Sequence, residues 1–424
     1  MIVVVHGLWH LGSVVAACLA RAGHQVIGID RDAAVIAALR GGTPPVAEPG
    51  LGELLREHAA RLEFTTDPAA AARADVAWIA YDTPVDADDR ADVELVVGEV
   101  ARLLPHLRDG AVVIVSSQLP VGSVARLEAI RPGLAFACSP ENLRLGKAIA
   151  VFCDPDRVVV GVRDDAARAV IAELLAPITT RIEWMSVESA EMTKHAINAF
   201  LALSVTFANE LAAVCERVGA DAKQVERGLK TESRIGPKAY LAPGGAFAGG
   251  TLARDVAFLT ELGARHQLAL PLLSGVRPSN EAHKRWALRR LEDRLGSLAG
   301  ATIAVWGLTY KPGTDTLRRS AAVELCRDLA AAGASVVAWD PAVRALPAEL
   351  AASIALAGDA GGALRGASAL VIATEWPELA GVELAGPLAT MQRRLVIDAN
   401  RFLAKRFAGI ADVEYYAVGV PTHG

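Results

Sequence analysis

The sequence of 424 residues predicts an α/β protein with two doubly wound parallel sheets and a long helix between them. Short apolar runs alternate with helical segments over the first 187 residues, as parallel strands alternate with crossover helices. An uninterrupted helical pattern starts near residue 187, and a new strand–helix–strand pattern starts at residue 301. These three observations predict domains at 1–187, 188–295 and 296–424.

The first domain is expected to hold a parallel sheet, because its short apolar runs have the spacing of βαβ units with right-handed crossovers. Helical segments such as SVVAACLARAG and DAAVIAALRG lie between these runs. The expected strands are IVVV (2–5), QVIGI (25–29), VAWIAY (76–81), AVVIVSS (111–117), LAFACS (134–139) and RVVVGV (157–162).

The middle region is predicted to begin with one long helix, because VESAEMTKHAINAFLALSVTFANELAAVCERV contains neither Pro nor Gly before Gly219. Such a stretch exceeds the usual length of a globular helix. We expect it to join the domains and to pack against a second copy of the chain. A Gly/Pro-rich loop follows at 234–250, with more helix after it.

The last domain repeats the order of the first. ATIAVWGL (301–308) is a strand that ends in Gly-Leu, and a helix and a second strand ending at Asp340 follow it. Residues 3–32 show the same order of strand, Gly-Leu, helix, Gly, strand and Asp. This internal echo predicts two Rossmann-like domains.

Composition excludes several classes of function. The net charge of −5 argues against a nucleic-acid-binding protein, which usually carries a basic face. The N-terminal sequence lacks the basic region of a signal peptide, and we find no uncharged run long enough to span a bilayer. Five scattered cysteines without a C-x-x-C pair suit a reducing compartment, and no spacing suggests a metal. We expect a cytoplasmic protein without nucleic-acid, membrane or metal partners.

The turn after the first strand, G-L-W-H-L-G (7–12), is similar to the G-x-G-x-x-G fingerprint of dinucleotide-binding domains. Gly7 permits the tight turn, Gly12 lets the helix lie close to the strand, and Asp30 is placed to accept from ribose hydroxyls. Trp9 replaces the middle glycine, which lets the cofactor approach. We therefore expect a dinucleotide that is displaced or held more loosely around its pyrophosphate, with Trp9 packing against it.

Over almost its entire length the chain resembles the family of UDP-glucose/GDP-mannose (nucleotide-sugar) 6-dehydrogenases. The resemblance implies NAD as cofactor, a nucleotide-sugar substrate, a helical dimerisation core and a homodimer. It also implies oxidation of the sugar's primary alcohol to a carboxylate with two NAD, through a thioester on a cysteine. The matching motifs are EPGL (48–51), DTPVDADDRAD (82–92), SPENLRLGKAI (139–149), KHAINAFLALSVTFANELA (194–212), RIGPKAYLAPGGAFAGG (234–250) and GLTYKPGTDTLRRS (307–320).

The resemblance also implies roles for individual residues. Lys194 and Asn198 match the pair that stabilises the alkoxide, and they lie four residues apart on one helix face. Glu141 and Asp255 match acids of the reaction, and Thr83 matches a cofactor contact. The residues that match substrate contacts are Arg234, Tyr240, Gly244, Gly245, Gly249, Lys311 and Arg318.

The departures from the family pattern are concentrated at the chemistry. Thr251 stands at the position of the nucleophilic cysteine, Leu145 replaces a second acid, and Gln118 replaces a threonine that helps to hold water. A threonine hydroxyl is a far weaker nucleophile than a thiolate unless a base activates it. We therefore expect an altered reaction, limited to the two-electron alcohol/aldehyde step. The alternatives are full four-electron oxidation through the aldehyde hydrate, or a homologue that binds nucleotide sugars without redox chemistry.

Overall fold

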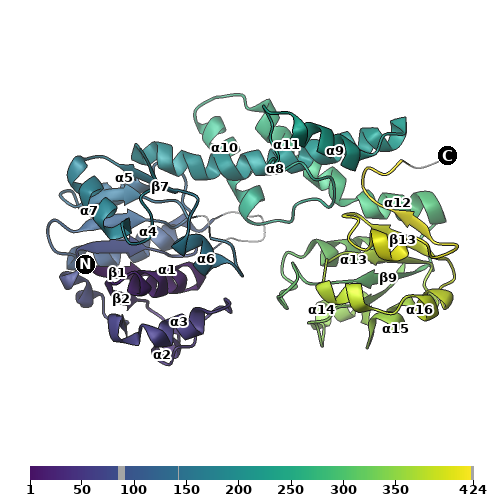
Figure 1. Cartoon of the computed structure of the whole chain (residues 1–424), viewed down its shortest axis with the longest axis horizontal. Coiled ribbons are helices and arrows are strands. Elements are labelled where there is room, and N and C mark those ends of the chain that lie inside the picture. The colour runs from purple at the N-terminus through teal and green to yellow at the C-terminus, as the bar shows by residue number, and fades with distance from the viewer. Residues whose placement is uncertain (85–90, 142, 422–424) are drawn as a thin grey trace. The chain divides into compact units, whose positions relative to one another are not determined.

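The computed structural model describes residues 1–84, 91–141 and 143–421. It confirms the predicted fold class, with two α/β sheets and one long helix, α8 (Val187–Val218), between them in the sequence (Figure 1). The chain forms two compact units, Met1–Ile197 and Asn198–Gly424, and the boundary between them lies inside α8. The three-domain boundaries stay a prediction.

The first unit contains an eight-stranded sheet in the order β3-β2-β1-β4-β5-β6-β7-β8. All six strands predicted for this region are present, and β3 and β8 are additional. The sheet is mixed rather than wholly parallel, because β7 pairs antiparallel with β6. The chain returns beside β6 after one short helix instead of crossing back to the start of that strand. The strands are β1 (Ile2–His6), β2 (Gln25–Ile29), β3 (Leu62–Thr65), β4 (Val76–Ile79), β5 (Val112–Val115), β6 (Ala135–Cys138), β7 (Val158–Val162) and β8 (Ile182–Met185).

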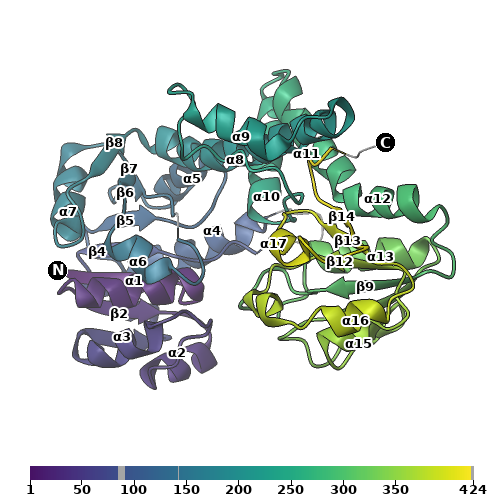
Figure 2. The ribbon, with the colours of Figure 1, turned by 45° about the vertical axis from the view of Figure 1, so that its right-hand side comes forward.

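Helices cover both faces of this sheet (Figure 2). A separate apolar core fills the space on each side of the sheet. Aspartates start several of these helices because their side chains accept the first free amides; Asp32, Asp92 and Asp164 do so for α2, α4 and α7. The helices are α1 (His10–Arg21), α2 (Ala33–Arg40), α3 (Leu51–Glu57), α4 (Val93–Leu103), α5 (Ser123–Ile130), α6 (Ala148–Cys153) and α7 (Asp165–Leu175), with single 3₁₀ segments η1 (Ala59–Arg61), η2 (Pro68–Arg73) and η3 (Leu104–His106).

The second unit begins with helices. The helix α8 ends at Val218, directly before Gly219, as the sequence predicts. By length and composition α8 could cross a membrane, with a mean hydropathy of 1.5 over its most apolar window, 44% of which is buried. Core helices of globular proteins have the same composition, so it carries no argument for a membrane. The helices that follow are α9 (Ala222–Thr231), α10 (Thr251–Arg265), α11 (Pro271–Lys284) and α12 (Trp286–Leu295).

The second sheet has the order β11-β10-β9-β12-β13-β14, and each neighbouring pair is parallel. It is also covered on both faces, with one apolar core on each side. The strands are β9 (Thr302–Trp306), β10 (Ser335–Trp339), β11 (Ile354–Leu356), β12 (Ala369–Ile372), β13 (Leu395–Asp398) and β14 (Glu414–Tyr416). The helices are α13 (Ala321–Ala331), α14 (Ala348–Ala351), α15 (Ala360–Leu364), α16 (Ala385–Ala389) and α17 (Ala404–Phe407), with the 3₁₀ segment η4 (Pro377–Gly381).

The two units repeat the same backbone turn and the same hydrogen bond after their first strands. Gly7 and Gly307 both have φ of 90°. In each unit the aspartate after the second strand accepts the amide after this glycine, at 2.7 Å from Leu8 to Asp30 and at 2.7 Å from Leu308 to Asp340. Asp340 is 1% exposed and also accepts from Trp376, so its carboxylate is committed to the fold. Asp30 makes the equivalent hydrogen bond but is only half-buried, so its carboxylate stays accessible.

Candidate active site

The glycine turn of the first unit lies at the carboxyl end of β1, where α/β sheets bind ligands. Gly7 has a positive φ that favours glycine. A Cβ on Gly12 would lie 1.7 Å from the Gly7 carbonyl oxygen, so only glycine lets α1 approach the turn this closely. The structure therefore requires both glycines that the sequence singled out.

Trp9 lies at the N-terminal cap position of α1, where its carbonyl oxygen accepts the Ser13 amide at 3.1 Å. Its side chain is 52% exposed, so the indole belongs to the surface of the turn and not to the core. The contact of Trp9 with a pyrophosphate stays a prediction.

Two further predicted residues lie together at the same edge of the sheet. Thr83 follows β4 and donates its hydroxyl to the Gln118 carbonyl oxygen after β5 at 2.7 Å. Beside them, the buried Ser117 hydroxyl has no hydrogen-bond partner within the described residues. Ser117 did not stand out in the sequence, because a serine at a strand end is common.

These features fit NAD. The glycine turn opens α1, whose N-terminal amides favour an anionic pyrophosphate. Asp30 accepts from the Leu8 and Asp32 amides at 2.7 and 2.9 Å, and these contacts fix its carboxylate at the end of β2. A fixed carboxylate at that place suits ribose hydroxyls. The unpartnered Ser117 hydroxyl offers a further polar contact at this edge.

Gly12→Ala is expected to destabilise the first unit by about 1–3 kcal/mol and to weaken NAD binding, because its Cβ forces α1 away from the turn. Urea unfolding and titration with NAD measure the two effects. Gly98→Ala on α4 is the matched control, since a Cβ there meets nothing within 4 Å. It should raise stability by about 0.5–1 kcal/mol. Equal behaviour of the two variants would contradict the close packing of the turn.

Trp9→Gly is expected to tighten NAD binding by about tenfold, equivalent to about 1.4 kcal/mol. The change restores the middle glycine of the fingerprint, and glycine is also tolerated at a helix N-cap. Calorimetric titration measures the affinity, and Trp9→Phe is a control that keeps an aromatic ring there. An unchanged affinity in Trp9→Gly would count against steric obstruction by the indole.

The segment that carries Glu141 follows β6. Its start is fixed because the Ser116 hydroxyl donates to the Ser139 carbonyl oxygen at 2.6 Å. The half-buried Glu141 carboxylate accepts the Leu143 amide. Leu145 is 40% exposed, so its apolar side chain fills no core position. The acid that the family resemblance implies at position 145 is therefore missing for no evident packing reason.

The helix α8 carries the predicted alkoxide-stabilising pair. Lys194 is half-buried and Asn198 is buried, and their four-residue spacing places both on one face of the helix. The Asn198 side-chain amide donates to the carboxylate of Asp255 on α10, which is 0% exposed. The structure thus brings two of the predicted catalytic residues, Asn198 and Asp255, into contact.

Thr251 is the first residue of α10 and is exposed. The preceding Gly250 has φ of 113°, a conformation that favours glycine. Thr251 therefore stands at a helix N-terminus, one helical turn before Asp255. This is a favourable place for a nucleophilic thiolate, but here it bears a hydroxyl.

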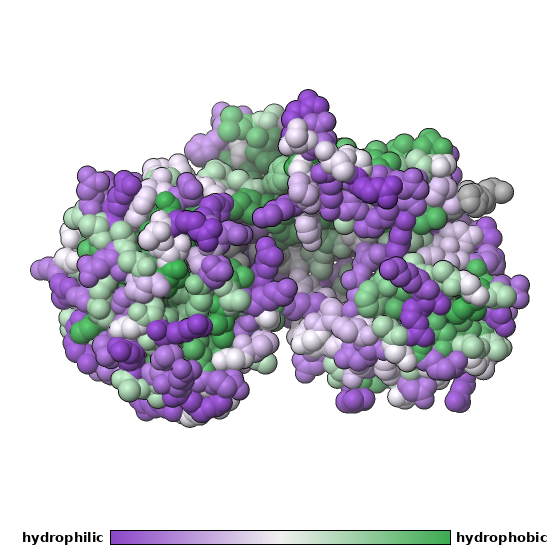
Figure 3. All heavy atoms as spheres, in the orientation of Figure 1, coloured by the Kyte–Doolittle hydropathy of each residue, from purple (hydrophilic) through white to green (hydrophobic). Residues whose placement is uncertain are grey.

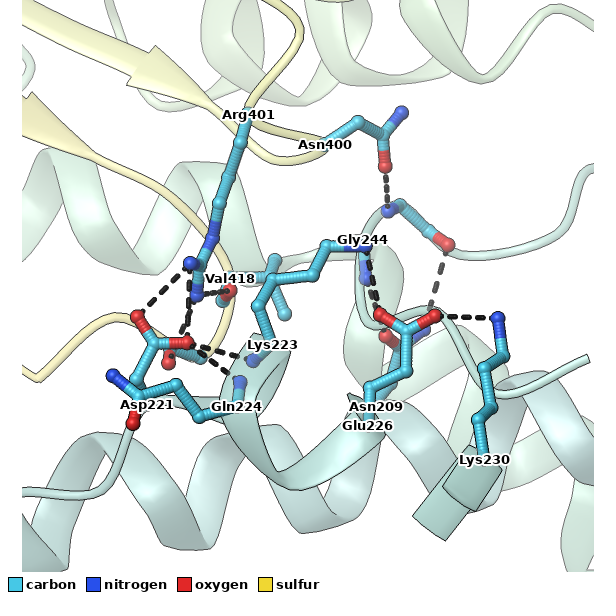
Figure 4. Close-up of polar contacts among 12 residues, drawn as sticks. Asn209, Asp221, Lys223, Gln224, Glu226, Lys230, Gly244, Asn400, Arg401 and Val418 are labelled. Carbon is cyan, nitrogen blue, oxygen red and sulfur yellow. Dashed lines mark hydrogen bonds and ion pairs between the residues drawn. The ribbon is translucent and has the colours of Figure 1, made fainter. Parts of the chain in front are cut away.

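Asparagine side chains hold the predicted glycine loop (Figure 4). Asn209 accepts the Gly244 amide at 3.0 Å, and Asn400 accepts the Gly245 amide at 2.7 Å. A Cβ on Gly244 would lie 2.1 Å from the Asn400 side-chain oxygen, so a larger residue there would displace this side chain. These two amides are already bonded within the protein. Their expected role as phosphate ligands stays a prediction.

Asn400 is followed by Arg401, which anchors the segment that carries Asn400 to the start of α9. The Arg401 guanidinium pairs with Asp221 at 3.0 Å and donates to the Val418 carbonyl oxygen at 3.3 Å (Figure 4). Neither asparagine stood out in the sequence, because an isolated asparagine has no diagnostic spacing.

A cavity of about 820 Å³ lies next to this loop in the second unit. Gly245 and Lys311, both predicted substrate residues, line it together with Asn400, Lys284, Glu324 and Arg327. Its volume suits a nucleotide-sized ligand. Burial alone would lower the pKa of Lys284, but its hydrogen bonds to Glu324 and Glu281 raise it, so this cation stays charged.

Other predicted substrate residues do not line this cavity. Arg234 is exposed and pairs with Glu232 at 2.9 Å, and Tyr240 is 58% exposed. Arg318 and Gly249 are also outside the cavity lining. Their substrate contacts stay predictions. Among the residues that the structure describes, no cluster of His, Cys, Asp and Glu could hold a metal ion.

Comparison with known proteins gives matches along the chain. Residues 1–179 match the UDP-glucose/GDP-mannose dehydrogenase family, NAD binding domain. Residues 188–282 match the central domain of that family, and residues 304–405 match its UDP binding domain.

Individual relatives are similar over almost the full chain. UDP-glucose 6-dehydrogenase YwqF of Bacillus subtilis is 33% identical, over 99% of this chain and 98% of its own. UDP-glucose 6-dehydrogenase of Rhizobium meliloti is 34% identical, with 98% of each chain covered. The structure of a UDP-glucose dehydrogenase from Pyrobaculum islandicum has a TM-score of 0.87 and 31% identity, covering 99% of this chain and 98% of that one.

Proposed function

Because the chain belongs to the UDP-glucose/GDP-mannose dehydrogenase family, we propose that it performs an altered form of that family's NAD-dependent oxidation of a nucleotide sugar. In this proposal the primary alcohol is oxidised to the aldehyde, and the covalent route onward to the carboxylate is lost. The observation that carries the proposal is Thr251 at the N-terminus of α10, where the family resemblance implies a cysteine.

The first oxidation removes a hydride from the sixth carbon, and the proton of its hydroxyl group passes to water. Bound NAD supplies the hydride acceptor. The Lys194 ammonium and the Asn198 amide are placed on one face of α8 to stabilise the oxygen as negative charge develops. The contact of Asn198 with the buried Asp255 fixes its amide in one orientation. The chain thus keeps the groups that the first step needs.

The second oxidation lacks its covalent catalyst. A threonine hydroxyl is almost entirely protonated at neutral pH, and Thr251 has no histidine neighbour in the sequence that could activate it. Two other positions also depart from the family pattern. Leu145 replaces an acid, and Gln118 replaces the threonine that helps to hold water. Three changes that bear on the same half-reaction favour its loss over independent drift.

The test is incubation of the full chain with NAD and a panel of UDP-, GDP- and other nucleotide sugars, with mass spectrometry of the products. We expect one NADH per sugar and an aldehyde, or a sugar rearranged through it. Two NADH per sugar with a uronate would overturn the two-electron proposal and favour oxidation of the aldehyde hydrate. No NADH with any sugar, together with no NAD binding, would favour a homologue that only binds nucleotide sugars.

We also propose that the chain forms a homodimer through the exposed side of α8. Phe200, Phe207, Val214 and Val218 are 65%, 49%, 55% and 69% exposed. Their spacing of 7, 7 and 4 residues places them in one stripe along α8. Hydrophobic side chains also reach the surface over the helical part of the second unit (Figure 3). A second copy offers the same stripe, so a two-fold interface can cover both.

Phe207→Glu is expected to turn the dimer into a monomer, because it buries a charge opposite an apolar partner. Light scattering after size-exclusion chromatography measures the mass. Arg217→Ala, on the same helix, should leave the mass unchanged. A wild-type chain that is monomeric at all concentrations would refute the dimer.

A further inference from the structure

Glu48, the acid of the EPGL motif, is buried at a junction of three segments of the first unit. Its side chain is 1% exposed. The carboxylate accepts the Gly146 amide at 2.7 Å, the Ala148 amide at 2.8 Å and the His10 side-chain nitrogen at 2.9 Å. Burial alone would raise the pKa of Glu48, but these hydrogen bonds lower it below its usual value. The group is therefore a charged acceptor whose two oxygens are both hydrogen-bonded.

One of these contacts caps a helix from a distant part of the chain. Ala148 is the first residue of α6, and Lys147 at its N-cap provides no side-chain cap within the described ranges. Glu48 fills that role from 100 residues away in the sequence. A carboxylate at a helix N-terminus also interacts favourably with the helix dipole.

The same contacts fix the end of the segment that carries Glu141. Its start is held at Ser139 by the Ser116 hydroxyl, and its end is held at Gly146 by Glu48. The third contact reaches His10, the first residue of α1, directly after the glycine turn. Glu48 thus links the cofactor turn to the segment of the predicted catalytic acid.

We propose that Glu48 is a positioning residue for Glu141 and that His10 joins this segment to the cofactor turn. The proposal rests on the proposed function, since it concerns turnover of a nucleotide sugar. Loss of the carboxylate frees the end of the segment, and misplacement of a reacting group by about 1 Å costs up to about 100-fold in rate.

The test compares Glu48→Gln, His10→Ala and His10→Gln with the wild-type chain. Glu48→Gln should lower kcat by about 10- to 100-fold while the Kd for NAD stays within about threefold. His10→Ala removes one of the three contacts and should lower kcat less than Glu48→Gln does. His10→Gln keeps a hydrogen-bond donor and should restore kcat. Glu53→Gln, an exposed acid on α3, is the matched control.

The outcomes separate the proposals. A wild-type chain without turnover on any nucleotide sugar contradicts the proposed function. An active wild-type chain whose Glu48→Gln variant keeps full kcat overturns the positioning role. If Glu48→Gln fails to fold, the His10 pair decides: equal kcat in His10→Ala and the wild type, with both folded, also overturns it.

A second inference rests on a different pair of residues. Cys18 on α1 is buried, and Cys153 at the end of α6 is partly exposed. Cys18 lies beside Cys153 where α1 contacts α6, and an Arg21 guanidinium nitrogen lies 3.8 Å from the Cys153 sulfur. The neighbouring Cys18 thiol, as the larger cause, and the Arg21 guanidinium lower the pKa of Cys153 below its usual value. An accessible thiolate beside a second thiol is the arrangement of redox-sensing cysteines.

The geometry points to a peroxide-sensitive modification site at Cys153, with Cys18 as the resolving thiol. The Cys153 thiolate attacks a peroxide oxygen, the O–O bond breaks, and a sulfenic acid forms with release of water. The Cys18 sulfur then attacks the sulfenic sulfur, the S–S bond forms and a second water leaves. Two thiols are oxidised to a disulfide, and hydrogen peroxide is reduced to two waters.

The test is peptide mapping of the folded chain after brief treatment with hydrogen peroxide. We expect a Cys18–Cys153 disulfide that dithiothreitol reverses. Cys153→Ser should abolish it, and Cys18→Ser should stop at the sulfenic acid. Cys326→Ser is the control, because burial raises the pKa of Cys326 to about 12. Treated wild-type protein in which Cys18 and Cys153 both stay reduced, or in which Cys153 is overoxidised without a disulfide, would overturn the inference.

Discussion

Thr251→Cys is expected to change the stoichiometry from one to two NADH per nucleotide sugar and to yield a uronate. The substitution places a thiol at the N-terminus of α10, after a glycine with φ of 113°. Helix N-termini lower the pKa of a cysteine and raise its thiolate fraction at neutral pH. A thiolate can add to the aldehyde to form a thiohemiacetal, which loses a hydride to a second NAD and becomes a thioester that water hydrolyses to the carboxylate. A threonine hydroxyl adds to the aldehyde far less readily.

The fold should tolerate this change. Thr251 is exposed, and cysteine is similar in size to threonine. Thr251→Ser keeps a hydroxyl group and should stay at one NADH, which makes it the matched control. The measurement is NADH yield against a limiting amount of sugar, with mass spectrometry of the product.

The second oxidation in Thr251→Cys should remain slower than the first, because Leu145 and Gln118 still depart from the family pattern. Adding Leu145→Glu and Gln118→Thr should raise its rate. If the triple variant still produces one NADH per sugar, the loss of the second step has another cause. If the wild-type chain already yields two, Thr251 is no obstacle and the aldehyde hydrate is the route.

Much of the fold follows from local sequence. The long helix is readable because no Pro or Gly interrupts it until Gly219, and α8 ends at Val218. The glycine turn could be predicted from the sequence because its two positions favour glycine. Gly7 has a positive φ, and Gly12 has no room for a Cβ. The antiparallel β7 is different, since its apolar run looks like that of a parallel strand and only the tertiary pairing sets its direction.

Some residues of the candidate site could be identified from the sequence, and others could not. Lys194, Asn198, Asp255 and Thr251 were found because they occupy fixed places in long motifs. The contact between Asn198 and Asp255 joins residues 57 positions apart, and no periodicity reports it. Asn209, Asn400 and Ser117 carried no signal, because their roles depend on the segments that fold against them. The contacts of Glu48 carried no signal either, because Gly146 and Ala148 lie 98 and 100 residues away.

Lys194→Ala is expected to lower kcat by about 100- to 1,000-fold and to change the Kd for NAD little. The alcohol oxygen gains negative charge as the hydride leaves, and an ammonium placed beforehand stabilises this charge without reorganising. A group that acts on developing charge affects kcat more than ground-state binding. Single-turnover kinetics with saturating NAD and nucleotide sugar measure the loss.

Two variants make this result specific. Lys194→Arg keeps the charge with a different geometry and should recover part of the rate, whereas a merely structural role would depend on packing alone. Arg217→Ala removes a cation from the exposed far end of the same helix and should keep the wild-type rate. If Lys194→Ala retains kcat and instead raises KM, the lysine binds substrate and transition state equally. The stabilisation of the alkoxide would then fall to Asn198, whose amide the buried Asp255 already orients.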